Sequence, residues 1–140
     1  MLCIEVEHVC WGNTGAATAD IVRRVNHPFL RINWDPANAL KAGEEPFPGG
    51  YSEVAEYVSH VHFKDAATNP ETGEVEWSMK GDIDWVGQIA ALKANGYRGY
   101  ISVESHCLPK VATAKAAVDR LRSLLETGRD TVSRTQSGGV

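Results

Sequence analysis

The sequence predicts a parallel α/β fold of the (β/α)8-barrel type, of which this chain of 140 residues supplies about four βα units. Strand-like and helix-like segments alternate along the chain, and connections of this length produce parallel sheets. Within each strand polar and apolar residues alternate, and the polar face becomes more charged toward the strand's C-terminal end. An open sheet with helices on both faces would be apolar on both. The polar face therefore favours a barrel, whose chemistry lies at the C-terminal mouth.

The expected elements follow in regular order. Strand-like runs occupy residues 2–8, 29–35, 58–66 and 100–106. Helical patterns occupy residues 18–25, 52–57, 85–95 and 110–127, the last two being followed by the stop signals Gly96 and Gly128. Turn signals between residues 69 and 81 predict a loop or a small hairpin over the mouth.

A closed barrel needs eight βα units and about 250 residues, so residues 1–128 are predicted to form half of one. The polar, Gly- and Ser-rich residues 129–140 predict a disordered tail. The first and last strands of a half-barrel have unpaired edges and leave the inner face open. Such a surface predicts a homo-oligomer, or an N-terminal half-barrel that this chain lacks.

Composition limits the partners. The chain carries 14 Lys and Arg against 18 Asp and Glu, a formal net charge of -4, which disfavours nucleic acids and anionic membranes and favours a small-molecule ligand. Its 3 cysteines form no CxxC pair. Neither a membrane-length apolar run nor an export signal is evident, so the expected compartment is the cytoplasm.

The polar faces of the expected strands end in residues that bind metals. The last inward-facing polar residues of the successive strands are Glu7, Asp35, His62 and Glu104. Three carboxylates at one mouth repel one another unless a cation neutralises them, and this donor set suits a divalent metal. Mn²⁺ is the first expectation, with Mg²⁺, Co²⁺ or Zn²⁺ as alternatives. Barrel stagger leaves Glu5, two residues before Glu7, as an alternative ligand.

The carboxylates also admit a purely structural interpretation. A buried carboxylate in a barrel often forms an ion pair, here with Arg31, Lys64 or Arg98. Four such residues at corresponding strand ends favour the metal site over separate ion pairs.

Five segments, taken together, resemble the C-terminal half of the xylose isomerase-like barrel superfamily. They are IEVEH at 4–8, NWDPAN at 33–38, HVHFKD at 60–65, GDIDW at 81–85 and GYRGYISVESH at 96–106. The order and spacing match over residues 2–107. This superfamily of TIM barrels includes sugar phosphate isomerases, ketose 3-epimerases, inosose dehydratases and endonuclease IV.

The resemblance implies the same four metal ligands and adds substrate-binding residues. Asn38 stands where the epimerases and endonuclease IV have a histidine, which disfavours a three-zinc nuclease site and departs from the epimerase pattern. Lys64 resembles the lysine of the isomerase and dehydratase branches, which lies near substrate oxygens. At the expected mouth, His8, His106 and Trp11 are further candidates for contact with a substrate.

The resemblance implies a metal-dependent isomerase or epimerase of a sugar or sugar phosphate, acting through an enediolate. Glu7 and Glu104 would be its acid and base. One alternative is a lyase of the inosose dehydratase type. The other is a truncated half-barrel without catalytic activity.

Overall fold

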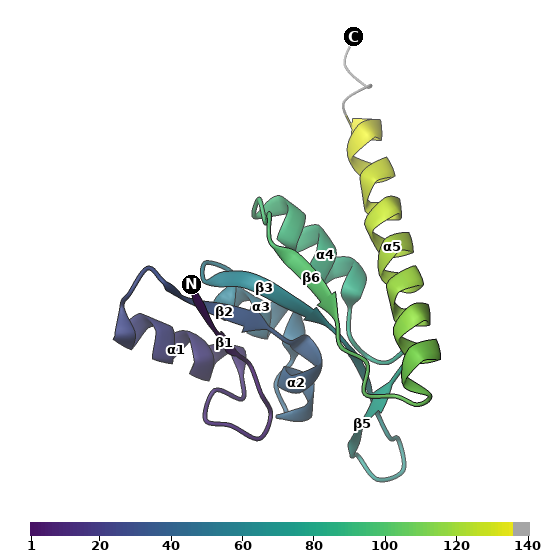
Figure 1. The fold of residues 1–140 in the computed structure, drawn as a ribbon, viewed down its shortest axis with the longest axis horizontal. Helices are drawn as coiled ribbons and strands as arrows, with labels where there is room; N and C mark the ends of the chain where they lie inside the picture. Colours follow the sequence, from purple (N-terminus) through teal and green to yellow (C-terminus); the bar gives the residue numbers. More distant parts are fainter. Residues whose placement is uncertain (136–140) are drawn as a thin grey trace.

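A four-stranded parallel sheet forms the centre of the protein (Figure 1). The computed structural model describes the backbone of residues 1–135 and the side chains of residues 1–127. The strands lie in the order β1 (Leu2–Glu5), β2 (Leu30–Trp34), β3 (Val58–Phe63) and β6 (Tyr100–Val103). All neighbours pair in parallel, as the sequence predicts, and the fold is a partial α/β barrel.

Helical segments connect the strands. They are α1 (Gly15–Val25), α2 (Pro36–Lys41), the π-helical turn η1 (Pro46–Gly50), α3 (Tyr51–Val54), α4 (Trp85–Ala94) and α5 (Lys110–Thr135). The sequence pattern predicts four of these helices but not α2 and η1. The α2 signal is present in the chain: Asp35 Oδ1 accepts a hydrogen bond of 2.9 Å from Asn38 N, and Pro36 occupies the first turn.

The helix expected to end before Gly128 continues to Thr135, which corrects the expected boundary. One glycine lowers helix stability by about 1 kcal/mol and does not by itself end a helix. Residues 129–135 of the expected disordered tail are therefore helical. Residues 136–140 of that tail lie outside the described residues.

A two-stranded antiparallel hairpin follows β3. Its strands are β4 (Asp65–Thr68) and β5 (Val75–Ser78), so the expected strand at 58–66 is divided after Phe63. Of the two alternatives predicted for residues 69–81, a loop or a small hairpin, the structure shows a hairpin, whose first strand begins earlier, at Asp65. The Arg120 guanidinium of α5 donates to Asp65 Oδ2 over 2.6 Å and so ties α5 to the start of β4.

The helix-covered side of the sheet holds the apolar core. Ile32, Trp34, Val61 and Phe63 alternate with the polar residues of β2 and β3 and are buried. Trp34 Nε1 donates a 3.0 Å hydrogen bond to Gln88 Oε1 of α4, and the Phe63 ring lies 4.4 Å from that of Trp85. Trp34 is thus part of the core, as its position in the alternation predicts.

The outer strands β1 and β6 each have one neighbour in the part of the sheet that the structure describes. Leu2 on β1 and Tyr100 on β6 are largely exposed. This is the edge pattern expected of a half-barrel. No described helix combines the length and the apolar character that crossing a membrane requires.

Candidate metal centre

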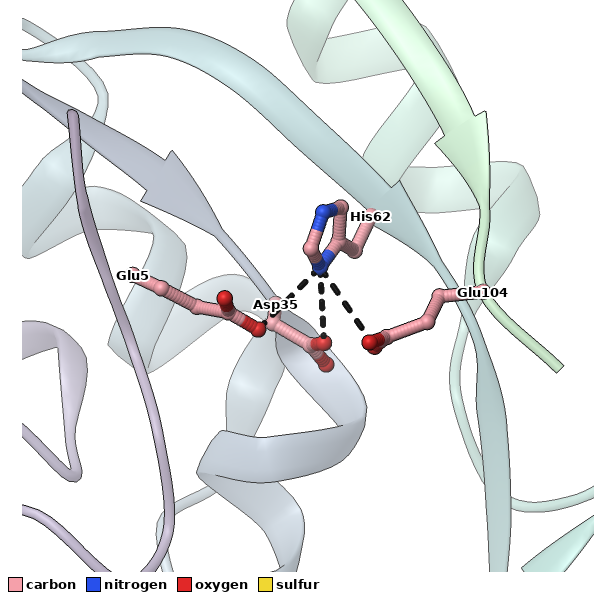
Figure 2. A group of neighbouring side chains, drawn as sticks. All are labelled: Glu5, Asp35, His62 and Glu104. Atoms are coloured by element: carbon pink, nitrogen blue, oxygen red, sulfur yellow. Dashed lines mark hydrogen bonds and ion pairs between the residues drawn. The ribbon is translucent and has the colours of Figure 1, made fainter. Parts of the chain in front are cut away.

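Four side chains converge where the strands reach their C-terminal ends (Figure 2). Glu5 ends β1, Asp35 directly follows β2, His62 lies on β3 and Glu104 directly follows β6. Their potential ligand atoms all lie within 4.8 Å of one another. Because parallel strands end at one edge of the sheet, residues distant in the sequence meet there.

Glu5 occupies the place for which the sequence analysis selects Glu7. Strand β1 ends at Glu5, and a turn begins at His8. Glu7 therefore leaves the sheet and places its Oε1 atom 2.6 Å from His8 Nδ1. Among the four converging side chains, Glu5, the alternative ligand, takes the position expected for Glu7. Asp35, His62 and Glu104 come together as expected.

His62 lies between the carboxylates. Its Nδ1 atom is 3.1 Å from Glu5 Oε1, 3.5 Å from Asp35 Oδ2 and 3.5 Å from Glu104 Oε2. Asn33 of β2 contacts the same ring, with its Nδ2 atom 3.0 Å from His62 Nε2. The interaction with Asp35 raises the pKa of His62; burial opposes this rise, and Glu5 and Glu104 reinforce it.

Lys64 is the second cation of the cluster. Its Nζ lies 2.8 Å from Asp35 Oδ2 and 2.7 Å from Glu104 Oε2. Burial alone would lower the pKa of Lys64, but the nearby charge of Asp35 and the charge and hydrogen bond of Glu104 raise it above its ordinary value. The lysine is therefore held as an ammonium, a donor close to any ligand at this site.

The two glutamates differ in their surroundings. Burial raises the pKa of Glu5, and the charge of His62 only partly opposes this. Burial would also raise the pKa of Glu104, but the hydrogen bond and charge of Lys64 outweigh it, so that this pKa is lowered. The cluster thus contains two carboxylates of unequal basicity, the property that acid–base pairs require.

The donor set fits a divalent cation. Two ligand atoms that each lie about 2.0–2.4 Å from one ion are separated by at most about 4.8 Å, which is the spread of this group. Asp35 Oδ2 is buried and accepts no well-oriented hydrogen bond from the described residues, although Lys64 and His62 are near it. A buried carboxylate oxygen in this position is suited to coordinate an ion.

Asn38 of α2 joins this cluster to its surroundings. The side chain is fully buried, and its Nδ2 atom donates to the Val6 carbonyl over 3.0 Å. Its Oδ1 atom accepts from Lys64 Nζ over 3.2 Å and lies 3.1 Å from His8 Nδ1. Two expected substrate-binding residues, Asn38 and Lys64, thus lie directly beside the metal-binding group.

Of the other expected mouth residues, His8 and His106 contact Trp77, whereas Trp11 is exposed. His106 Nε2 lies 3.6 Å from Glu104 Oε2, and the His106 ring stacks on Trp77 of β5 at 4.8 Å. His8 meets the same indole edge-on at 5.5 Å. Trp11 is 96% exposed and contributes no ring contact among the described residues.

Trp77 connects more of the mouth than its place in the sequence suggests. Lys64 Nζ lies 4.7 Å and Lys41 Nζ 5.1 Å from the centre of its ring. The indole therefore holds His8, His106 and Lys64 together from the hairpin side. The sequence places Trp77 on a mouth loop but carries no signal for its contacts with His8, Lys41, Lys64 and His106, because these residues come from four separate segments of the chain.

Residues 1–124 match the family model described as "Xylose isomerase-like TIM barrel". The chain belongs to this family. Two curated relatives are 3-dehydroshikimate dehydratases: one from Pseudomonas putida is 30% identical over 141 residues, and one from Pseudomonas aeruginosa is 31% identical over 137 residues. In each case the match covers 89% of this chain and 21% of the relative.

Solved structures show the same fold. A xylose isomerase domain protein from Planctomyces limnophilus superposes with a TM-score of 0.75 at 24% identity, covering 94% of this chain and 48% of that one. An L-ribulose 3-epimerase gives a TM-score of 0.70 at 17% identity, with 96% and 50% covered. This chain therefore spans about half the length of these barrels.

Proposed function

We propose that Glu5, Asp35, His62 and Glu104 bind one divalent cation, Mn²⁺ being the first choice and Mg²⁺, Co²⁺ or Zn²⁺ the alternatives. The observation that carries this proposal is the convergence of four ligand atoms within 4.8 Å from the ends of all four strands of the sheet. Oxygen donors with one imidazole suit these metals. Glu7, selected by the sequence analysis, is not required by this arrangement.

We propose further that this centre removes a proton beside the carbonyl group of a small polyhydroxylated substrate. The cation, when bound, supplies Lewis-acid polarisation of substrate oxygens. Glu5 and Glu104 reach in from opposite sides, with Asp35 and His62 between them (Figure 2). One carboxylate accepts the C–H proton and the other returns it, by way of an enediolate. The Lys64 ammonium donates a hydrogen bond to a substrate oxygen at the same site.

Two outcomes of this chemistry are proposed. Return of the proton to carbon gives isomerisation or epimerisation, as expected from the resemblance of the sequence; solved neighbours include an L-ribulose 3-epimerase and a D-psicose 3-epimerase. Loss of a neighbouring hydroxyl gives a dehydratase. This second outcome is supported by the two curated dehydratase relatives. It is also supported by Lys64 in the HxKD segment, residues 62–65, which resembles the dehydratase branch.

Deuterium exchange tests the common step. The purified chain is incubated in heavy water with L-ribulose, D-psicose, D-tagatose or 3-dehydroshikimate, with Mn²⁺ or with chelator. Mn²⁺-dependent deuterium incorporation beside the carbonyl is expected, and Glu104→Gln is expected to reduce it by about 10²-fold because an acid–base group is lost. Absence of exchange with every substrate, despite bound metal, would support the inactive half-barrel instead.

The barrel is proposed to be completed by four further βα units, from a second copy or from another segment. The edges of β1 and β6 and the open inner face are the surfaces for this contact. Sedimentation is expected to show a dimer or larger assembly of the isolated chain. A dilute monomer that unfolds cooperatively would contradict self-association.

A further inference from the structure

We propose that His8, oriented by Glu7 and Asn38, is the proton donor to a departing substrate hydroxyl. This inference rests on the proposed function and deepens it, because it assigns the elimination of water to a group separate from the metal ligands. The substrate class that follows is a β-hydroxy ketone. The contacts of the buried Asn38 amide support this assignment.

The orientation of the Asn38 amide is fixed by two unambiguous partners. The Val6 carbonyl, 3.0 Å from Nδ2, can only accept a hydrogen bond. The Lys64 ammonium, 3.2 Å from Oδ1, can only donate one. Nδ2 is therefore the donor and Oδ1 the acceptor, and the amide cannot be reversed without losing both bonds.

This orientation fixes the protonation of one nitrogen of His8. Asn38 Oδ1 lies 3.1 Å from His8 Nδ1, and Glu7 Oε1 lies 2.6 Å from the same nitrogen. Because Asn38 Oδ1 can only accept, its hydrogen bond requires hydrogen on Nδ1; Glu7 Oε1 lies close to the same nitrogen but accepts no well-oriented hydrogen bond from the described residues. Nε2 is then the nitrogen that gains and loses a proton. A carboxylate beside Nδ1 also balances positive charge on the ring before a proton is donated.

His8 is linked to the metal-binding group through Asn38 and is also open to solvent. Through Asn38 it lies one residue away from Lys64, which pairs with Asp35 and Glu104. His8 also lines an open cavity of 740 Å³ between α2 and the hairpin, together with Leu40, Lys41 and Trp77. Its side chain is 23% exposed, so the ring regains its proton from water.

Elimination of water would begin with removal of a proton and end with release of the hydroxyl oxygen. A carboxylate of the metal-binding group takes the proton from the carbon beside the carbonyl, and the C–H electron pair enters the enediolate and then the new C=C bond. The C–O bond at the next carbon breaks, and its oxygen leaves with the bonding pair. That oxygen takes a proton from His8 Nε2 and departs as water. His8 remains as the neutral ring with hydrogen on Nδ1.

Comparing two rates on one substrate tests this assignment. With Mn²⁺ and 3-dehydroshikimate, deuterium exchange reports C–H removal and ultraviolet absorbance reports the elimination product. His8→Gln is expected to slow elimination by about 10²-fold while exchange persists. Glu7→Gln is expected to slow elimination by a smaller factor. The control is His27→Gln, which changes an exposed histidine remote from the site and should leave both rates unchanged.

Nitrogen-15 NMR of the ring provides a readout independent of turnover. At a pH where the ring is neutral, the expected spectrum of metal-free protein shows the His8 hydrogen on Nδ1, and Asn38→Leu is expected to weaken that preference. Hydrogen on Nε2 instead would overturn the inference, as would equal slowing of exchange and elimination, or slowing of neither, in His8→Gln. Absence of exchange in the parent chain would overturn the proposed function, whereas the NMR result tests the orientation of His8 separately.

Discussion

The two faces of the central sheet perform different tasks with alternate residues of the same strands. On the helix-covered face, Trp34 and Val61 are fully buried among apolar neighbours. On the open face, Asp35 and His62, their neighbours in the sequence, belong to the charged cluster. Stability and chemistry are therefore separated here by the two-residue period of a β-strand, not by distance along the chain.

Removal of a large side chain from the helix-covered face should have the largest effect on stability. Trp34→Ala is expected to lower the free energy of unfolding by about 3–5 kcal/mol, because it removes a fully buried ring and leaves a cavity. Urea denaturation monitored by circular dichroism measures the loss. If the folded variant lost Mn²⁺ affinity while keeping its stability, the separation of the two faces would be wrong.

Metal binding should stabilise the chain through the open face. At a free Mn²⁺ concentration 100 times the dissociation constant, the free energy of unfolding is expected to rise by about 2.7 kcal/mol, since the folded state alone holds the assembled ligands. Thermal denaturation with Mn²⁺ and with excess chelator measures this. Equal stabilisation of Asp35→Asn, which retains a capping side chain for α2, would contradict the assignment of this residue as a ligand.

A smaller loss of stability is expected when the buried hydrogen bond between Trp34 and Gln88 is removed. Gln88→Met removes the acceptor of the Trp34 indole N–H, but it also removes a buried amide nitrogen that lacks a hydrogen-bond partner in the described part of the chain. These changes partly offset each other, and we expect a loss of about 1 kcal/mol. Chemical denaturation measures this change in the free energy of unfolding. The Mn²⁺ affinity of Gln88→Met is expected to equal that of the parent chain.

The sequence was sufficient to predict the parallel half-barrel and three of the four clustered residues. Alternation within the strands distinguishes inward from outward residues, and it does so correctly for Trp34 and His62. It does not show where a strand ends. Strand β1 ends at Glu5, and the pairing of β2 with β3 shifts between Ile32 and Asn33, so the layers of the mouth cannot be counted from sequence alone.

The contacts between mouth residues also could not be predicted from local sequence patterns, because they depend on how distant segments pack. The HxKD segment indicates that Lys64 is near the site, but its 2.8 Å contact with Asp35 depends on the packing of two strands. Trp77 reaches His8 and His106 only because the hairpin folds back over the strand ends. Helix α2, in contrast, was predictable from Asp35 and Pro36, which form a cap and a first turn.

Mn²⁺ titration of the parent chain and of two matched glutamate variants tests the central claim most directly. Glu5→Gln is expected to weaken binding by about 10²-fold, because it removes an ionic ligand at nearly constant volume, whereas Glu7→Gln should change the affinity by less than about tenfold. Calorimetry in one buffer, with folding checked by circular dichroism, provides both numbers. Loss of affinity in Glu7→Gln with normal binding in Glu5→Gln would contradict the metal centre described here.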